Sequence, residues 1–317
     1  MKVFILAGGF ATRLWPITEK RAKPLLPLAG KPLLTHLIDG LPTDLQVHVS
    51  TNAIFEEGFR TWLQHLGRKD VHLTIEDTRH DGEKLGALGA VAAWIRANKI
   101  EDDVLLLTGD NYFGLPLSRI LDAYDGKTTL LAAHDLQDRA KAKHFGTVLA
   151  DASGLVTGFE EKPAEPKSSL VSTGCSILPK SLLLELLLFA DKKPDNVGGI
   201  FEHFLARRLP MQVLQFSEPW LDIGSFNSYL EAHALIVGEK IVTGDGSTVE
   251  STNCTGSIAI GKNCTIKNSE LRDCIVFDGA HIENTTLTRC IVDNDCVLQG
   301  VDLQEKMLRA GTRLELQ

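Results

Sequence analysis

Paired glycines followed by two cations stand near the start of the chain, an order of residue types suited to binding phosphate. Gly8 and Gly9 follow an apolar run at residues 3–7, and Arg13 and Lys23 come after them at short range. Glycine N–H groups can approach a polyphosphate closely because no Cβ intervenes. The arginine offers a fork of donors and the lysine a compact point charge. The segment therefore predicts a site for a triphosphate.

Two common nucleotide-binding motifs are excluded by the same segment. No Gly-Lys-Ser/Thr follows the glycines, as it would in a P-loop, and the third glycine of a dinucleotide fingerprint is absent. For the glycine pair alone, an ordinary turn with solvated basic residues is the alternative. The specificity comes from the whole string.

That string, GGFATRLWPITEKRAKPLL at residues 8–26, resembles the opening motif GGxGTRLxPxTxxxPKPLL of the sugar-1-phosphate nucleotidylyltransferases. Ala11 replaces the third glycine, and Ala22 replaces the proline before the lysine. Alanine at position 11 permits close backbone approach if its φ stays negative. The resemblance implies catalytic roles for Arg13 and Lys23. It implies a nucleotide-binding role for Leu6, Ala7, Gly8 and Gly9.

Composition limits the classes of partner. The 317 residues are 44% apolar, enough for a sizeable core, and carry a formal net charge of -8. This charge argues against a general nucleic-acid or anionic-membrane surface. No apolar run is long enough to span a bilayer or to serve as a signal peptide, so a cytoplasmic protein is expected. The six cysteines form no CxxC pair and are interpreted as buried small hydrophobes.

Strand-like and helix-like runs alternate as far as residue 238, which favours a sheet flanked by helices. We predict an α/β, Rossmann-like nucleotidyltransferase domain at residues 1–238, with a mostly parallel mixed sheet. The expected strands are residues 3–7, 46–50, 71–75, 104–108 and 128–133. The expected helices are residues 55–66, 86–97, 181–189, 201–209 and 227–237.

In residues 239–317 the apolar residues are spaced differently from those of the preceding domain. Aliphatic or cysteine residues recur every five or six positions, at Val249, Cys254, Ile260, Ile266, Leu271, Val276, Ile282, Leu287, Val292 and Val297. This hexapeptide repeat predicts a short left-handed β-helix of roughly three coils at about eighteen residues each. The family resemblance covers this tail. Because so short a solenoid needs capping or a partner, we expect a homo-oligomer formed through it.

Two carboxylates are candidates for a metal site. Asp110 follows the apolar run at residues 104–107, and ligands of open α/β sheets gather at such strand ends. Asp222 lies in WLDIGS, which resembles the family segment WxDIGTPxxYLEA, with Ser-Phe in place of Thr-Pro. The resemblance implies that both aspartates hold Mg²⁺, which prefers carboxylate and phosphate oxygens. A turn role for Asp110 and a helix-capping role for Asp222 are the alternatives.

Further segments resemble the family's substrate-binding blocks. By that resemblance Glu161 accepts hydrogen bonds from sugar hydroxyls, Lys162 binds the sugar phosphate, and the Gly146 and Gly174 backbones line the sugar-phosphate site. Residues 74–78 and 82–90 resemble the base-binding stretch, with Glu76 and Gly86 as its contacts. A carboxylate at Glu76 could accept from guanine N1–H and N2–H₂ or from a single pyrimidine N3–H, and the sequence leaves the choice open.

Together these residues imply transfer of a nucleotidyl group to a sugar-1-phosphate with release of pyrophosphate. The attacking phosphate is already an anion, so charge neutralisation matters more than a general base. The expected substrates are glucose-1-phosphate with dTTP or UTP, with mannose-1-phosphate and GTP as the alternative. A non-catalytic regulatory relative and an acyltransferase tail are the other hypotheses. Only His281 in the tail is available as an acyltransferase base.

Overall fold

The computed structural model describes residues 1–79, 82 and 84–316. It divides into two compact units, Met1–Gly9 with Leu37–Trp220, and Phe10–His36 with Leu221–Gln317. The glycines of the opening motif thus fall in the first unit and its two cations in the second. No helix in the described ranges is long and apolar enough to cross a membrane.

A mixed nine-stranded sheet forms the centre of the first unit in the described residues. Strands β5, β4, β1 and β6 run parallel, and β11 joins β6 in the antiparallel sense. The strands of this sheet are β1 (Lys2–Leu6), β4 (Gln46–Asn52), β5 (Val71–Glu76), β6 (Val104–Thr108), β8 (Thr129–Asp135), β9 (Gly146–Ala150), β10 (Val156–Glu161), β11 (Leu170–Leu178) and β12 (Met211–Phe216). The unbroken apolar runs of β1 and β6 fit parallel strands covered on both faces.

Helices α3, α6 and α7 share one apolar core with this sheet. Trp94 of α3 stacks on Phe4 of β1, with ring centres 4.6 Å apart, and Phe201 of α7 packs on Phe159 of β10. The α-helices are α1 (Leu33–Asp39), α2 (Glu56–Leu66), α3 (Ala87–Asn98), α4 (Leu117–Asp122), α5 (Arg139–Ala142), α6 (Leu183–Ala190), α7 (Val197–Ala206) and α8 (Phe226–Val237). The short strands outside the main sheet are β2 (Pro27–Leu28), β3 (Lys31–Pro32), β7 (Asn111–Phe113) and β13 (Trp220–Asp222).

The predicted elements are present, and the largest boundary difference is at α7. Helix α7 begins at Val197 rather than at residue 201, because it runs through Gly198 and Gly199. The Asn196 side chain accepts a hydrogen bond from Gly199 N at 2.8 Å and starts the helix there. Two glycines in a first turn disguised this helix start in the sequence.

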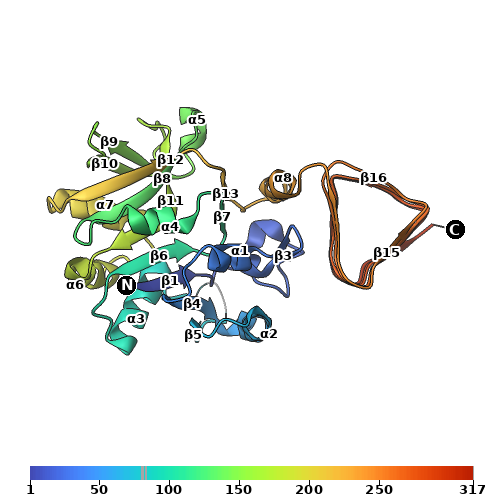
Figure 1. Ribbon diagram of the computed structural model, residues 1–317, viewed down its shortest axis with the longest axis horizontal. Coiled ribbons are helices and arrows are strands. Elements are labelled where there is room, and N and C mark those ends of the chain that lie inside the picture. Colours follow the sequence, from blue (N-terminus) through green and yellow to red (C-terminus); the bar gives the residue numbers. More distant parts are fainter. Residues whose placement is uncertain (80–81, 83, 317) are drawn as a thin grey trace. The chain divides into compact units, whose positions relative to one another are not determined.

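The tail is a three-sided β-helix, drawn at the C-terminal end of the colour bar in Figure 1. In the described residues its three faces contain five, five and four parallel strands, so the prediction of three coils is too low. Equivalent positions are 16 or 17 residues apart rather than eighteen, because the corners are tight turns with left-handed residues such as Asn268 and Asp273. The three faces are β14 (Ile241–Thr243), β17 (Ile258–Ile260), β20 (Ile275–Val276), β23 (Ile291–Val292) and β26 (Met307–Leu308); β15 (Thr248–Glu250), β18 (Thr265–Lys267), β21 (His281–Glu283), β24 (Val297–Gln299) and β27 (Arg313–Glu315); and β16 (Asn253–Thr255), β19 (Glu270–Arg272), β22 (Thr286–Thr288) and β25 (Asp302–Gln304).

Most of the predicted inward positions of the tail are correct. The interior contains Ile260, Ile266, Leu271 and their equivalents in later coils. Leu298, not Val297, points inward, because Leu298 lies directly next to the inward Ile282 of the preceding coil. The cysteines are free, and all but the half-buried Cys254 are buried, as small apolar residues should be.

Candidate active site

Several predicted nucleotide-binding residues and one predicted metal ligand lie where the parallel strands of the first unit end. Gly8 and Gly9 follow β1, Glu76 ends β5, and Asp110 follows β6. Because these strands are parallel neighbours, their carboxyl ends share one edge of the sheet. The sequence predicts each of these residues separately, and the parallel pairing of the strands brings them to one edge of the sheet.

The loop after β1 is anchored to β4 and open on its other side. Ala7 N donates to Ser50 O, and the Asn52 amide donates to Gly8 O, each at 2.8 Å. A Cβ on Gly8 would make only ordinary contact with β4, and one on Gly9 would meet nothing within 4 Å. No neighbouring protein atom in the described residues thus requires a glycine at position 9. The open space suits the close approach of a ligand.

Glu76 lies beside this loop. Its Oε1 accepts a hydrogen bond of 2.6 Å from Ser50 Oγ, and burial raises the pKa of its carboxyl. Sequence reasoning missed the three buried polar residues that end β4, Ser50, Thr51 and Asn52. Their signal was a polar triplet directly after an apolar strand.

Gly86 has a packing role in the structure. Its φ is +78°, and a Cβ there would lie 2.6 Å from the Pro194 carbonyl group. That carbonyl also accepts from Leu88 N and Gly89 N, at the first turn of α3. The predicted contact of Gly86 with a base stays a prediction. Glu83, from the same base-binding stretch, lies outside the described residues.

Thr108 connects the predicted metal ligand Asp110 with the predicted sugar-phosphate residue Gly174. The Asn111 amide donates to Asp110 Oδ1 at 2.9 Å and also to Thr108 Oγ1. Gly174 has a φ of +72°, and a Cβ on it would lie 2.4 Å from Thr108 Oγ1. Only glycine lets β11 approach the end of β6 this closely.

Glu161 lies between two glycines. A Cβ on Gly146 would lie 3.0 Å from Glu161 Oε2, and one on Gly198 only 1.9 Å from it. The Lys162 ammonium is 3.6 Å from Glu161 Oε1, and its side chain is two-thirds exposed. Three predicted sugar-phosphate residues therefore gather here, together with Gly198, which was not predicted.

The first turn of α7 completes this group. Glu161 N donates to Glu202 Oε1 at 3.1 Å, and the Glu161 carboxylate borders Gly198 in the first turn. A carboxylate near a helix N-terminus is stabilised by the helix dipole. The sequence signal was the string Asn196-Val197-Gly198-Gly199, in which a capping residue is followed closely by two glycines.

In the second unit, Arg13, Lys23 and Asp222 form one charged cluster. The Lys23 ammonium is 3.5 Å from Asp222 Oδ1, and the lysine is only 7% exposed. A Cβ on Gly224 would lie 3.3 Å from Arg13 Nη2 and 3.7 Å from Asp222 Oδ1. In the described part of the chain, no hydrogen bond or ion pair engages the exposed Arg13 guanidinium. The cluster presents two cations around one carboxylate.

The helix cap near this cluster is Ser225, so the capping alternative for Asp222 is wrong. Ser225 Oγ accepts from Ser228 N at 3.2 Å, and the Ser228 side chain returns a bond to the Ser225 backbone. This reciprocal arrangement is a capping box. Serine thus replaces the family's threonine in the capping position.

Ala11 contradicts the expectation of a negative φ. Its φ and ψ are 47° and 46°, in the left-handed region, which is unfavourable for a residue with a Cβ. Its carbonyl accepts from Leu14 N at 3.0 Å and from Thr18 Oγ1 at 3.1 Å. These two bonds hold the turn that the family's glycine would form without strain.

The predicted magnesium ligands, Asp110 and Asp222, have carboxylate oxygens of the kind that Mg²⁺ binds. Among the described residues, no group of three or more His, Cys, Asp or Glu could hold a metal ion. Mg²⁺ bound through one or two carboxylates and substrate phosphates needs no such group. Asp110 and Asp222 supply suitable oxygens, and their metal role stays a prediction.

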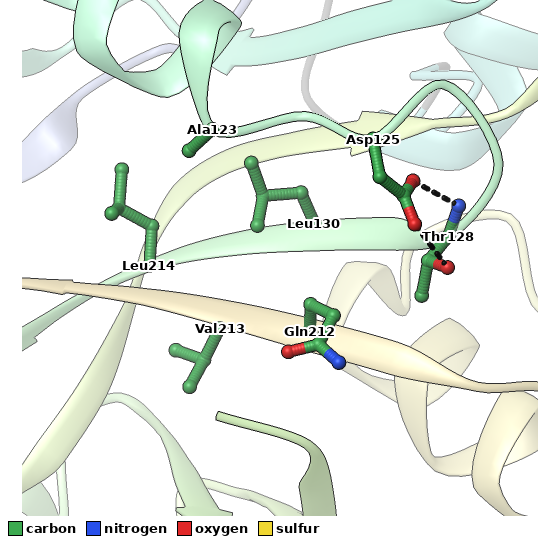
Figure 2. Close-up of a pocket in the computed structure, with 7 residues that line it drawn as sticks. All are labelled: Ala123, Asp125, Thr128, Leu130, Gln212, Val213 and Leu214. Carbon is green, nitrogen blue, oxygen red and sulfur yellow. Dashed lines mark hydrogen bonds between the residues drawn. The ribbon is translucent and has the colours of Figure 1, made fainter. Parts of the chain in front are cut away.

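A cavity of about 310 Å³ lies elsewhere in the first unit, along β8 and β12 (Figure 2). None of the predicted site residues lines it. Its one carboxylate, Asp125, accepts from Lys127 N, Thr128 N and Thr128 Oγ1 at 2.7–2.8 Å, so its oxygens serve a turn. We do not assign the reaction to this cavity.

Comparison with known proteins shows the family. The sequence profile described as nucleotidyl transferase matches residues 2–239. A putative mannose-1-phosphate guanyltransferase from Sulfolobus acidocaldarius is 26% identical over 87% of this chain and 76% of its own length. A glucose-1-phosphate thymidylyltransferase from Streptomyces antibioticus is 23% identical over 99% of this chain and 88% of its own length.

Other relatives are longer, and a solved structure shares the fold. The chain spans 60% of the length of the glucose-1-phosphate adenylyltransferase of Thermosipho africanus. The crystal structure of a putative glucose-1-phosphate thymidylyltransferase from Bacillus anthracis, in complex with a sucrose, is similar with a TM-score of 0.64 and 24% identity. The match covers 74% of this chain and 94% of that one.

Proposed function

The chain belongs to the nucleotidyl transferase family, and from this membership we propose that it transfers a nucleotidyl group from a nucleoside triphosphate to a sugar-1-phosphate. The products are a nucleoside diphosphate sugar and pyrophosphate. The observation that carries the proposal is the cluster of Arg13, Lys23 and Asp222, which offers cations to phosphate groups. Retention of Arg13, Lys23, Asp110 and Asp222 argues against a regulatory relative that only binds nucleotide sugars.

In the proposed reaction, a sugar-phosphate oxygen attacks the α-phosphorus and pyrophosphate leaves. The protein's task is to hold two polyanions together and offset their charge. Lys23 is suited to the α-phosphate or the sugar phosphate because burial and Asp222 restrict the position of its ammonium. The exposed Arg13 guanidinium is assigned to the leaving pyrophosphate, which it can bind through two parallel hydrogen bonds.

Asp110 and Asp222 are proposed to bind Mg²⁺ together with the phosphates. When bound, the ion would offset negative charge on the phosphates and so assist the transfer. Asn111 orients Asp110 through a hydrogen bond to its Oδ1. Lys23 orients Asp222 through the ion pair between its ammonium and Asp222 Oδ1.

The sugar phosphate is assigned to the group around Glu161. Glu161 accepts from sugar hydroxyls, Lys162 reaches the phosphate, and the Gly146 and Gly174 backbones permit close approach. In support, the Lys162 side chain is two-thirds exposed and the Glu161 carboxylate lies against glycine backbone. Gly198 and the start of α7 join this proposed site.

Glucose-1-phosphate with dTTP or UTP is the proposed substrate pair. Ser50 donates to Oε1 of Glu76 and so restricts the position of the carboxylate, whose other oxygen can accept the single N3–H of thymine or uracil. The thymidylyltransferase from Streptomyces antibioticus matches 99% of this chain, the tail included. Mannose-1-phosphate with GTP is the alternative, favoured by the similarity to the putative mannose-1-phosphate guanyltransferase of Sulfolobus acidocaldarius.

The test measures pyrophosphate release with five nucleotides (UTP, dTTP, GTP, ATP, CTP) against four sugar-1-phosphates (glucose, mannose, galactose, N-acetylglucosamine). We expect release only when Mg²⁺ and a sugar phosphate are both present. Glu76→Gln is the matched variant, because it keeps an acceptor for Ser50 and alters the group facing the base. It should lower kcat/KM for dTTP and UTP by roughly 10-fold or more. A preference for GTP of more than about tenfold over both pyrimidines would reverse the order of substrates.

Assembly through the tail is a separate proposal. Ile241 in the first coil and Leu316 near the end of the last are each more than half exposed, and the end coils leave strand edges unpaired. We propose a homo-oligomer formed through these ends. Light scattering of the full chain tests it, and the mass of a single chain would exclude it.

A further inference from the structure

One face of the β-helix is apolar on its outside as well as its inside. In the sheet of β14, β17, β20, β23 and β26, Val276 and Val292 belong to the interior core. Their neighbours Ile275 and Ile291 must therefore point outward, since side chains alternate along a strand. Both are nevertheless at most 1% exposed. This outer face, called the docking face below, is covered by other parts of the second unit.

The opening motif is one of the segments on the docking face. The Arg21 guanidinium carbon lies 4.9 Å from the centre of the Phe277 ring. Arg21 Nη1 is 3.3 Å from Asp293 Oδ1, and the Asp293 side chain is only 8% exposed. Both partners of Arg21 therefore come from the docking face.

A second ion pair joins the same two parts of the chain. Arg309 donates through Nε to Glu19 Oε2 at 2.6 Å and through Nη2 to Glu19 Oε1, so the pair is bidentate. Such fork-shaped pairs fix direction as well as distance. Helix α8 joins the same arrangement, because Tyr229 of α8 donates its hydroxyl hydrogen to Pro27 O and α8 itself contacts β17.

Glu19 and Arg21 stand between the two proposed catalytic cations in the sequence. Arg13 and Lys23 are therefore carried by the segment that the docking face holds, Phe10–His36. We propose that the β-helix is a positioning scaffold for this segment, with Asp293 and Arg309 as positioning residues for Arg13 and Lys23. The inference rests on the proposed function and adds to it a role for the tail within a single chain.

Loss of the contacts on the docking face should displace Arg13 and Lys23 more than it weakens the binding of substrates. Removing the Asp293 charge would leave Arg21 partly buried without its carboxylate partner, so the segment would shift to solvate it. A displacement of about 1 Å in a charge that stabilises a transition state can cost roughly 10²-fold in rate. Turnover should therefore respond more strongly than substrate binding.

The test compares Asp293→Asn with Asp302→Asn in the full chain. Asp302 is an exposed carboxylate on another face of the tail, and the same substitution there controls for lost charge. We expect Asp293→Asn to lower kcat by roughly 10- to 100-fold with both KM values little changed, and Asp302→Asn to behave like the parent. Hydrogen exchange across residues 10–36 should be faster in Asp293→Asn alone.

Two further comparisons separate positioning from general destabilisation. The double variant Arg21→Gln with Asp293→Asn should be no slower than the worse single variant, because the residues act as a pair. If Asp293→Asn does not fold, Arg309→Gln and Glu19→Gln test the more exposed pair in the same way. Unchanged exchange across residues 10–36 in a folded variant would overturn the inference. If the parent enzyme itself turns over no substrate pair, the proposed function fails, and the exchange measurement still decides the scaffold role.

Discussion

The Lys23 ammonium lies 3.5 Å from Asp222 Oδ1, although the two residues come from opposite ends of the predicted catalytic domain. Lys23 is almost fully buried, and the Asp222 side chain is about one-third exposed. A buried cation needs a partner, and a carboxylate that stays accessible can also face a ligand. Asp222 therefore has two proposed roles, as partner of Lys23 and as metal ligand.

These two roles distinguish Asp222 from Asp110. Asp110→Asn and Asp222→Asn should each lower Mg²⁺-dependent turnover by roughly 10²-fold, the usual scale for one electrostatic group. Asp222→Asn should also lower the thermal midpoint, by about 2–4 °C, because it weakens the contact with Lys23. Pyrophosphate release and thermal unfolding measure both effects. Undiminished activity in either variant would falsify the metal assignment.

The two cations should matter more than their neighbours in the same segment. Arg13→Ala and Lys23→Ala are expected to lower turnover by roughly 10²-fold or more, since each removes one donor to the transition state. Lys20→Ala, an exposed cation between them, serves as the control and should keep parental activity. An equal loss of turnover in all three variants would indicate a general effect of positive charge in the segment and would contradict specific roles for Arg13 and Lys23.

Lys162 should act on one substrate only. Its ammonium lies beside Glu161 in the proposed sugar-phosphate site, in the unit that does not contain Arg13. Lys162→Ala is expected to raise the KM for the sugar phosphate more than that for the nucleotide. Steady-state kinetics with each substrate varied in turn decides this, and an equal rise in both values would assign the lysine to another role.

Relief of backbone strain should be measurable at Ala11. Ala11→Gly is expected to stabilise the protein by about 0.5–1 kcal/mol, because glycine adopts the observed positive φ without a clash of Cβ. Ala22→Gly is the matched control in the same segment. Ala22 has a φ of -65°, and glycine there should destabilise the protein. Urea unfolding measures the free energy of unfolding of both variants. If both variants change it in the same direction, the proposed backbone strain at Ala11 is contradicted.

His233 predicts a loss of stability in acid. Burial in α8 lowers its pKa from 6.5 to about 4, and in the described residues neither ring nitrogen has a hydrogen-bond partner. As the pH falls below 6.5, the unfolded chain binds a proton that the folded chain does not bind until about pH 4. The free energy of unfolding should therefore fall across this range, by roughly 3 kcal/mol in full.

The less buried His48 also has a pKa lowered to about 4, so it adds to the same fall in the free energy of unfolding. The variant His233→Leu removes the contribution of His233 and leaves that of His48. The variant should flatten the fall in urea midpoint between pH 6.5 and 4. A slope identical to that of the parent would exclude His233 as its source.

Local patterns in the sequence were sufficient for the elements and for several of the candidate site positions. The run before Gly8, the carboxylate after β6 and the repeat of the tail are each constrained by chain neighbours. A pattern of single residues therefore predicted the α/β sheet, the β-helix and the place of Asp110 at the end of β6, whereas the role of Glu161 was implied by the family resemblance. The docking face also left a local trace. Its strands read Ile-Val-Phe and Ile-Val-Asp, with apolar residues in adjacent positions, as in strands that are covered on both sides.

Only the tertiary structure decided which of these residues meet. The pair Lys23 and Asp222, the place of Glu161 against Gly198, and the contact of Arg21 with Asp293 each join segments far apart in the sequence. Such contacts depend on how whole elements pack, and no local spacing encodes them. The left-handed φ of Ala11 has the same origin, because the fold of the segment imposes a conformation that alanine alone disfavours.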